Sequence, residues 1–355
     1  MEREITPEIE NTIKGWMMGE SKYKDLPRKP YEERVKDCIE FYKMGGSVAF
    51  YNVYGLDCEG FRNKEDFFTW DDINVGGLNK EKQSKHKYKN LFSKKQFAEF
   101  MEENFPEYSP KIYYWFKGDI VDKGEFAGED FLTAMNRLEN GYYFLKITDI
   151  DQGKGVFAIQ KIGRAFVINN GELLIDELIE QYVKKSNYLI LQERLYNHPA
   201  IAAFNPSSLN TIRIVTTKFK TNPYVLSATL RTGAKSDAYV DNASQGGTFI
   251  GINDETGELM EWGYYVFVKG KTREKEHPIS HIKYEGYKIP FWKEILNACK
   301  KVHLMADYYN SVAWDVALTE DGPKIIELNV GWGHDVVQAP HGGLKKKWLD
   351  LKEKE

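Results

Sequence analysis

Two strand-like apolar runs near the end of the chain each carry an acidic residue. They lie in VAWDVALTEDGPKIIELNVGWG, residues 312 to 333. VAWDVAL and PKIIELNV are rich in residues that favour strands, and the TEDGP between them holds the Asp-Gly and Pro of a turn, so the segment predicts a β-hairpin. If the turn is centred on Asp321, then Asp315 faces Glu327 across the hairpin.

Side chains alternate along a strand, so Asp315 shares its face with two small alanines, while Glu327 and Asn329 point the same way from the opposite strand. Opposed Cβ atoms lie about 5 Å apart, and two carboxylates at that distance repel unless a proton or a cation lies between them. Two carboxylates and an amide oxygen suit magnesium. The alternative is a hairpin whose acids point into solvent, and the hairpin alone does not decide between them.

Charge and composition exclude several classes of protein. A net charge of −4 over 355 residues and a pI near 6.1 argue against nucleic acid as the main partner. The start, MEREITPEIE, lacks the apolar region of a signal peptide, and no run approaches the roughly 20 apolar residues of a membrane span. We therefore expect a soluble, cytoplasmic protein. The three cysteines have no metal or disulfide spacing, which fits a reducing compartment.

Helical patterns dominate the first part of the chain, in ITPEIENTIKGWM and PYEERVKDCIEFYKM. A basic stretch, NKEKQSKHKYKN, follows and is interpreted as a solvated linker. From there to the end strands and helices mix, which predicts an α+β fold.

A glycine-containing loop joins two strands in GYYFLKITDIDQGKGVFAIQKI. Gly153 and Gly155 let backbone N–H groups approach a phosphate, and Lys146 at the strand end supplies a positive charge. Further on, the strand in SNYLILQERL ends at polar residues that can meet an adenine edge. An ordinary glycine hairpin and a strand leaving the core are the alternatives.

Two arginines lie in strand-like segments, Arg213 in SLNTIRIVTTKF and Arg231 after YVLSATL. A guanidinium among buried strand residues must find an anion, and its planar fork suits phosphate or carboxylate. A structural salt bridge satisfies each arginine equally well. Asn242 and a Gly246-Gly247 pair follow, which strengthens the interpretation as a ligand site.

Taken in order, these motifs resemble the ATP-grasp superfamily. The resemblance is closest to the sugar-transfer-associated ATP-grasp group, through SLNTIRIVT, VDNASQGG, IPFW and AWDVALTEDGPKIIELN, and it covers residues 50 to 340. It implies an α+β fold in which two lobes clasp ATP. The corresponding division is an N-terminal helical lead-in at 1–85, a small lobe with a phosphate lid at 86–195 and a large lobe with the metal site at 196–355.

The resemblance also assigns roles to individual residues. It implies that Lys146 holds phosphates, and Lys89 is a candidate for a second phosphate lysine. The catalytic residues that it implies are Arg213, Arg231 and Asn242, and the two arginines would contact the transferred phosphate. The lid would comprise Asp149 to Gly155, with Gln152, Gly153 and Lys154. The adenine contacts would be Gln192, Glu193 and Leu195, in the run 192–195. The Mg²⁺ ligands would be Asp315, Glu327 and Asn329.

The activity that the resemblance implies is ATP-dependent ligation of a carboxylate to an amine through an acyl phosphate. Its sugar-transfer association suggests that an amino acid or simple amine is joined to a uronic acid in surface (capsular) polysaccharide biosynthesis. The alternatives are a phosphotransferase acting on a hydroxyl and a non-catalytic nucleotide-binding module. The segment NVGWGHD departs from the proline-glycine turn of many relatives. Candidates for the acceptor pocket are Trp332, His334, Asp335, Gln338 and His341, of which the histidines are alternatively placed on a surface loop.

Overall fold

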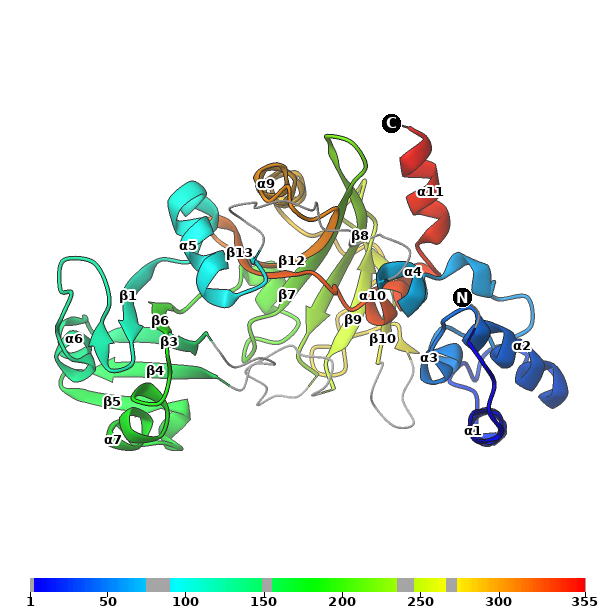
Figure 1. The fold of residues 1–355 in the computed structure, drawn as a ribbon, viewed down its shortest axis with the longest axis horizontal. Coiled ribbons are helices and arrows are strands. Elements are labelled where there is room, and N and C mark those ends of the chain that lie inside the picture. Colours follow the sequence, from blue (N-terminus) through cyan, green and yellow to red (C-terminus); the bar gives the residue numbers. More distant parts are fainter. Residues whose placement is uncertain (1–2, 75–89, 149–154, 235–245, 266–272, 355) are drawn as a thin grey trace. The chain divides into compact units, whose positions relative to one another are not determined.

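The computed structural model describes residues 3–74, 90–148, 155–234, 246–265 and 273–354 and divides into two compact units (Figure 1). Each unit contains an antiparallel sheet with helices, which confirms the α+β class. The division at residues 85 and 195 stays a prediction. We call the two units large, with Met1–Lys89, Asn197–Pro323 and Asn329–Glu355, and small, with Asn90–Tyr196 and Lys324–Leu328.

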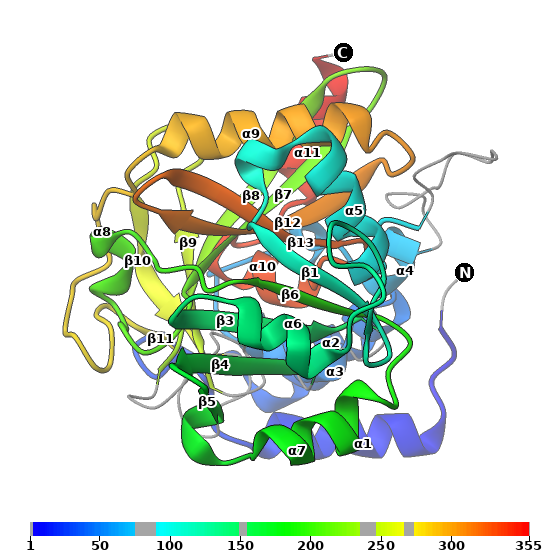
Figure 2. The same cartoon turned by 90° about the vertical axis from the view of Figure 1, so that its left-hand side faces the viewer.

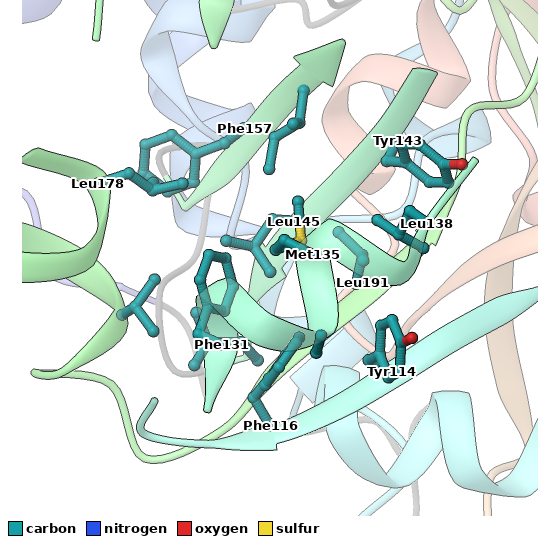
Figure 3. Close-up of a cluster of buried hydrophobic side chains, with 14 of the residues drawn as sticks. Tyr114, Phe116, Phe131, Met135, Leu138, Tyr143, Leu145, Phe157, Leu178 and Leu191 are labelled. Carbon is teal, nitrogen blue, oxygen red and sulfur yellow. The ribbon is translucent and has the colours of Figure 1, made fainter. Parts of the chain in front are cut away.

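The small unit is built on a six-stranded antiparallel sheet with strand order β2-β1-β6-β3-β4-β5. Figure 3 shows its core, where Phe131 and Met135 of α6 and Leu178 of α7 pack against Leu145 and other apolar side chains of the sheet. Its elements are α5 Lys94–Asn104, β1 Ile112–Lys117, β2 Ile120–Val121, α6 Phe131–Arg137, β3 Gly141–Ile147, β4 Val156–Ile162, β5 Ala165–Ile168, α7 Ile175–Leu178 with a π-helical turn Ile179–Val183, and β6 Leu189–Glu193.

Alternation along β3 separates the core of the small unit from its functional face. Tyr143, Leu145 and Ile147 are buried in the core. Phe144 and Lys146 therefore point to the opposite face of the sheet. The predicted pair of strands around the glycine-containing loop is confirmed by β3 and β4, which are antiparallel neighbours.

The second sheet has seven strands in the order β11-β10-β9-β8-β7-β12-β13, and all of it belongs to the large unit except Lys324–Leu328 of β13. The predicted hairpin near the C-terminus is confirmed: β12 and β13 are separated by Glu320 and Asp321, and Gly322 takes a left-handed φ of 102° after this turn. The bounds are β7 Thr211–Lys218, β8 Pro223–Thr232, β9 Thr248–Ile252, β10 Leu259–Tyr264, β11 Arg273–Glu274, β12 Ser311–Thr319 and β13 Gly322–Asn329.

Two helices cover opposite faces of this sheet. On one face α9, Trp292–Met305, packs across β7, β8 and β12 (Figures 1 and 2). There the Thr216 hydroxyl lies 2.7 Å from Nδ1 of His303 in α9 and accepts a hydrogen bond from Nε1 of Trp314. On the other face α10, His334–His341, contributes Val337 to a cluster with Val215 of β7, Leu226 of β8 and Ala313 of β12. This second face also carries Arg213 and Asp315, because they alternate with the side chains that face α9.

The N-terminal helices share a core with the edge of the large sheet. The two predicted helices are confirmed as α1, Pro7–Met18, and α2, Tyr31–Lys43, and α3, Val48–Val53, follows. The Thr6 hydroxyl caps α1 by accepting from the Ile9 N–H, and proline occupies the first helical position. Apolar residues of these helices pack with Phe249, Tyr264 and Ala339. The remaining helices are α4 Trp70–Asn74, α8 Pro199–Ala202 and α11 Lys345–Glu353.

Among the described residues, no helix is long and apolar enough to cross a membrane. The longest of them, α9, has 14 residues, fewer than the roughly 20 that a span requires.

Candidate functional site

A pocket in the small unit brings together residues of the helix α5 and of the strands β1, β3, β4, β6 and β13. It encloses about 140 Å³ and contains three predicted site residues, Lys146 from β3, Gln192 from β6 and Glu327 from β13. Most of the other residues that line the pocket are apolar. The lining comprises Leu91, Phe92, Lys94, Phe97, Ala98, Met101, Ser109, Pro110, Ile112, Val156, Ile190, Ile325, Ile326 and Leu328 besides these three.

Strand register explains why the predicted side chains converge. Lys146 pairs with Ile190 on β6 and with Val156 on β4, and all three line the pocket. Gln192 lies two residues beyond Ile190 on the same strand, so its side chain points to the same face. An apolar slot with a few convergent polar groups is the usual form of a small-molecule site.

The pKa of Lys146 is lowered in this pocket. Burial disfavours its charged form and lowers the pKa of the ammonium to about 8, an effect that the nearby Glu327 carboxylate opposes and the Lys94 charge reinforces. The pocket therefore holds two amines and a carboxylate that interact electrostatically. Sequence reasoning missed Lys94, which begins α5. Its only signal was the amphipathic pattern KKQFAEFM, which did not indicate where the helix packs.

Several predicted small-unit contacts have other partners or lie outside the described residues. Gly155 accepts a hydrogen bond from the Ile147 N–H at 2.7 Å, which closes the strand pair. The Glu193 carboxylate accepts from the Lys111 N–H at 2.7 Å, and Leu195 is buried. The assignment of these residues to adenine and phosphate stays a prediction. The other predicted phosphate contacts lie outside the described residues, namely Asp149, Gln152, Gly153, Lys154 and the candidate Lys89.

A buried ion-pair cluster occupies the α10 face of the large unit. Arg213 pairs directly with Asp315 across β7 and β12, and its Nε and Nη2 donate to the two carboxylate oxygens at 2.7 Å each. Arg231 Nη1 donates to Oδ2 at 3.0 Å. The Asp315 residue is 4% exposed. The two arginines thus have the carboxylate partner that their burial requires, and this partner is the predicted metal ligand.

The arginines keep Asp315 ionised. Burial alone raises the pKa of a carboxyl group, but the charges and hydrogen bonds of Arg213 and Arg231 outweigh it and hold the pKa of Asp315 well below its usual range. Asn329 lies beside it, with Nδ2 at 3.5 Å from Oδ2. A side-chain amide can present either its oxygen or its nitrogen, so a carboxylate and an amide oxygen can converge on one ion. This donor set fits magnesium, provided that the arginines yield the carboxylate.

The predicted magnesium set is divided between the units. Asp315 and Asn329 belong to the large unit, whereas Glu327 lies in the small unit and lines its pocket. The opposition of Asp315 and Glu327 stays a prediction. In the part of the chain that the structure describes, no group of three or more His, Cys, Asp or Glu side chains could hold a metal ion.

The structure contradicts the surface-loop alternative for the two histidines after β13, whereas the acceptor pocket stays a prediction. His334 and His341 belong to α10, not to a surface loop, and His334 is buried. His341 Nε2 lies 3.0 Å from the Ala228 carbonyl oxygen, and burial lowers its pKa to about 4. Gln338 bonds the backbone of Phe68 through both side-chain atoms. His341 and Gln338 therefore connect α10 to neighbouring segments of the chain. Trp332 is buried in the apolar cluster that contains Val337 of α10. Asn242 lies outside the described residues, and the side chain of Asp335 is not described either.

The family of the chain follows from its sequence match. A family model described as sugar-transfer associated ATP-grasp matches residues 85–351, well over half of the chain. The match spans both the pocket residues of the small unit and the ion-pair cluster of the large unit. The chain is therefore an ATP-grasp protein, and it belongs to the sugar-transfer associated ATP-grasp family. No curated protein matches the sequence.

Several solved ligase structures are similar in fold. L-amino acid ligase from Bacillus licheniformis is 12% identical over 70% of this chain and 44% of its own, with a TM-score of 0.38. D-alanyl-alanine synthetase A from Vibrio cholerae is 8% identical over 75% and 65%, with a TM-score of 0.43. VanG D-Ala:D-Ser ligase from Enterococcus faecalis is 12% identical over 74% and 62%, with a TM-score of 0.42. The chain thus spans less than two thirds of the length of each of these proteins.

Proposed function

We propose that this chain is an ATP- and Mg²⁺-dependent ligase that joins a carboxylate to an amine. The carboxylate is a uronic acid, the amine is an amino acid or a simple amine, and the product is an amide of surface polysaccharide biosynthesis. Membership of the sugar-transfer associated family supports the class of reaction. The observation that supports the proposal is the buried Arg213–Asp315–Arg231 cluster, because two guanidinium forks that suit anions lie beside a carboxylate that suits Mg²⁺.

In the small unit, the pocket supplies the groups that bind a nucleotide. Its apolar walls suit a flat base, and Gln192, which lines the pocket, would hydrogen-bond the edge of that base. Lys146 provides a positive charge for phosphate oxygens. We assign the second phosphate lysine to Lys94 in place of Lys89, because Lys94 lines the same pocket.

In the large unit, the two arginines supply the charge that the reaction requires. Their guanidinium groups match phosphate and carboxylate geometry. Asp315 and Asn329 would hold Mg²⁺, together with Glu327. Bound MgATP would supply the phosphoryl group that activates the substrate carboxylate as an acyl phosphate before the amine attacks.

A covalent enzyme intermediate is not needed for this chemistry, and the cysteines do not suit one. All three cysteines are buried. Burial raises the pKa of the Cys38 thiol to about 12 and that of Cys58 to about 11, so their nucleophilic thiolate forms are scarce at neutral pH. Catalysis would instead rest on charge stabilisation by fixed cations.

Nucleotide affinity is expected to depend on pH through Lys146. The ammonium is charged below its pKa of about 8 and loses its proton as the pH rises through that value. Since the anionic ligand prefers the charged lysine, the affinity for ADP should be constant below about pH 8 and fall up to tenfold per unit above it. Calorimetric titration between pH 6.5 and 9.5, values chosen to bracket about 8, measures this. Lys146→Arg, which stays charged, should bind with a flat profile, and an equally steep fall in this variant would exclude Lys146 as the cause.

Product analysis tests the reaction itself. The protein is incubated with MgATP and with uronic acids and candidate amines, singly and in pairs, while ADP, phosphate and product mass are followed. Ligation predicts ADP and phosphate release that require both substrates, with an amide product free of phosphorus. A phosphorylated product formed without any amine would identify a phosphotransferase instead. Lys146→Met serves as the inactive control, since it keeps the size of the side chain without its charge.

A further inference from the structure

Trp70 is a large side chain that the large unit displays to solvent. It is 58% exposed, although Phe68 and Ile73, its near neighbours in the chain, are both buried. Phe68 and Ile73 belong to the apolar cluster that also contains Val337 of α10. The segment therefore packs through the residues on either side of Trp70 and leaves the indole itself in water, which hydrophobic burial does not explain.

The segment that carries Trp70 is fixed to the C-terminal helices of the same unit. The Phe68 N–H donates to Gln338 Oε1 at 2.7 Å, and the Phe68 carbonyl oxygen accepts from Gln338 Nε2 at 3.0 Å. Within α4, Asp72 forms an ion pair with Lys345 at 3.3 Å. Because the backbone is held at these points, a ligand that binds the indole does not have to order the segment first.

The exposed indole lies beside the turn that joins β13 to α10. Its ring centroid is 6.2 Å from that of His334, the first residue of α10 (Figure 1). A Cβ on Gly333, the residue before it, would lie 3.5 Å from Arg213 Nη1. A Cβ on Gly331 would meet none of the described atoms within 4 Å, so the described residues leave open space over this turn. The indole and the Arg213 guanidinium therefore both border the same turn.

An indole and a guanidinium at one turn suit a sugar acid. A pyranose ring carries C–H groups that pack on an aromatic face while its hydroxyl groups stay in water. A carboxylate on the same ring matches the planar fork of a guanidinium. A neutral sugar would use only the indole, and a small carboxylic acid would use only the guanidinium. Recognition of both parts therefore selects a sugar acid.

We propose that Trp70 is the platform on which the sugar ring of the uronic acid stacks, and that it determines the preference for a sugar acid over small carboxylic acids. This inference rests on the proposed function, in which Arg213 supplies charge for the reacting groups. Trp70 lies outside residues 85–351, which the family model matches. The segment before the matched region therefore supplies a substrate-binding residue of this chain.

Saturation-transfer difference NMR on the intact protein, with MgADP and glucuronate, tests the proposal. Saturation of aromatic protein protons should pass to the ring C–H protons of glucuronate in the wild type. The dissociation constant for glucuronate should be about tenfold higher in Trp70→Ala, because one stacking contact is lost. Acetate, which lacks a ring, should bind both proteins equally. Equal affinity of both proteins for glucuronate, or no transfer to its ring protons in the wild type, would overturn the proposal.

Further variants separate stacking from other effects of the substitution. Trp16→Ala removes an indole that is 46% exposed on α1, and it should leave glucuronate affinity unchanged. Trp70→Phe keeps an aromatic face and should retain most of the affinity, whereas Trp70→Leu keeps apolar bulk without that face and should behave like Trp70→Ala. Thermal melts and the affinity for ADP confirm that each variant is folded. A wild-type dimer that Trp70→Ala dissociates in sedimentation velocity would make this surface a contact between copies and overturn the proposal.

The outcomes separate this proposal from the ligase activity. Weaker glucuronate binding in Trp70→Ala without any turnover by the wild type would support the platform and contradict the ligase. Amide formation by the wild type, with an equal KM for the uronic acid in Trp70→Ala, would support the ligase and contradict the platform.

Discussion

Replacing Asp315 by asparagine is expected to lower the free energy of unfolding by about 3–5 kcal/mol. The substitution keeps the shape of the side chain but leaves Arg213 and Arg231, which are 16% and 11% exposed, without the carboxylate that balances them. Urea unfolding at pH 7, followed by circular dichroism, measures the loss. The variant should also be inactive, because the same carboxylate is the proposed metal ligand.

The pH dependence of this loss has a definite sign. The pKa of Asp315 is lowered in the folded protein, so its ionised form contributes stability above the unfolded pKa of about 4, and this contribution is lost as the pH falls through the lower folded value. The difference between wild type and variant should therefore shrink in acid. Asp321→Asn, in the exposed turn of the same hairpin, is the matched control and should be neutral. A loss below about 1 kcal/mol for Asp315→Asn would show that the arginines find other partners.

Glu327→Gln is expected to abolish turnover, by about 10³-fold or more, while the free energy of unfolding changes by less than about 1 kcal/mol. Glu327 is half-buried, so the isosteric amide keeps the packing of the pocket. Two effects act on activity. The proposed metal site loses a charged ligand, and Lys146 loses the carboxylate that raises its pKa, so less of its charged form is present at neutral pH. Steady-state rates and thermal melts measure the two quantities separately.

The control for this variant is Glu125→Gln, which makes the same change at an exposed position of the small unit and should affect neither quantity. Non-cooperative melting of Glu327→Gln would mean that the acid maintains the fold. Full activity of this variant would remove Glu327 from the proposed site altogether.

Local patterns in the sequence predicted the elements well because each has its own physical signal. The Asp-Gly turn between apolar runs predicted the β12–β13 hairpin, and the glycine-containing loop predicted the β3–β4 pair. A lysine near the end of β3 was also predictable from its position after an aromatic strand. The convergence of Lys146 with Gln192 came from order along the chain and family resemblance.

Contacts between strands distant in the sequence were not predictable in the same way. Arg213 and Asp315 are 102 residues apart, and they meet because β12 lies next to β7 in the sheet, an order that no hairpin pattern encodes. The sequence left open whether each arginine binds a ligand or a structural carboxylate. The structure shows the carboxylate, and it is one that the sequence had assigned to metal alone. Lys94 was missed for the same reason, since its role depends on where α5 packs.

The boundary of the family match and the boundary of the folding unit do not coincide. The match begins at residue 85, yet α1, α2 and α3 share their apolar core with Phe249, Tyr264 and Ala339. Arg62 also donates to the Tyr264 hydroxyl, and Lys345 forms an ion pair with Asp72. A fragment trimmed to the homologous region would expose aromatic side chains along one edge of the large sheet. Engineering of this protein must therefore retain the N-terminal helices as part of the scaffold that supports the arginine-bearing strands.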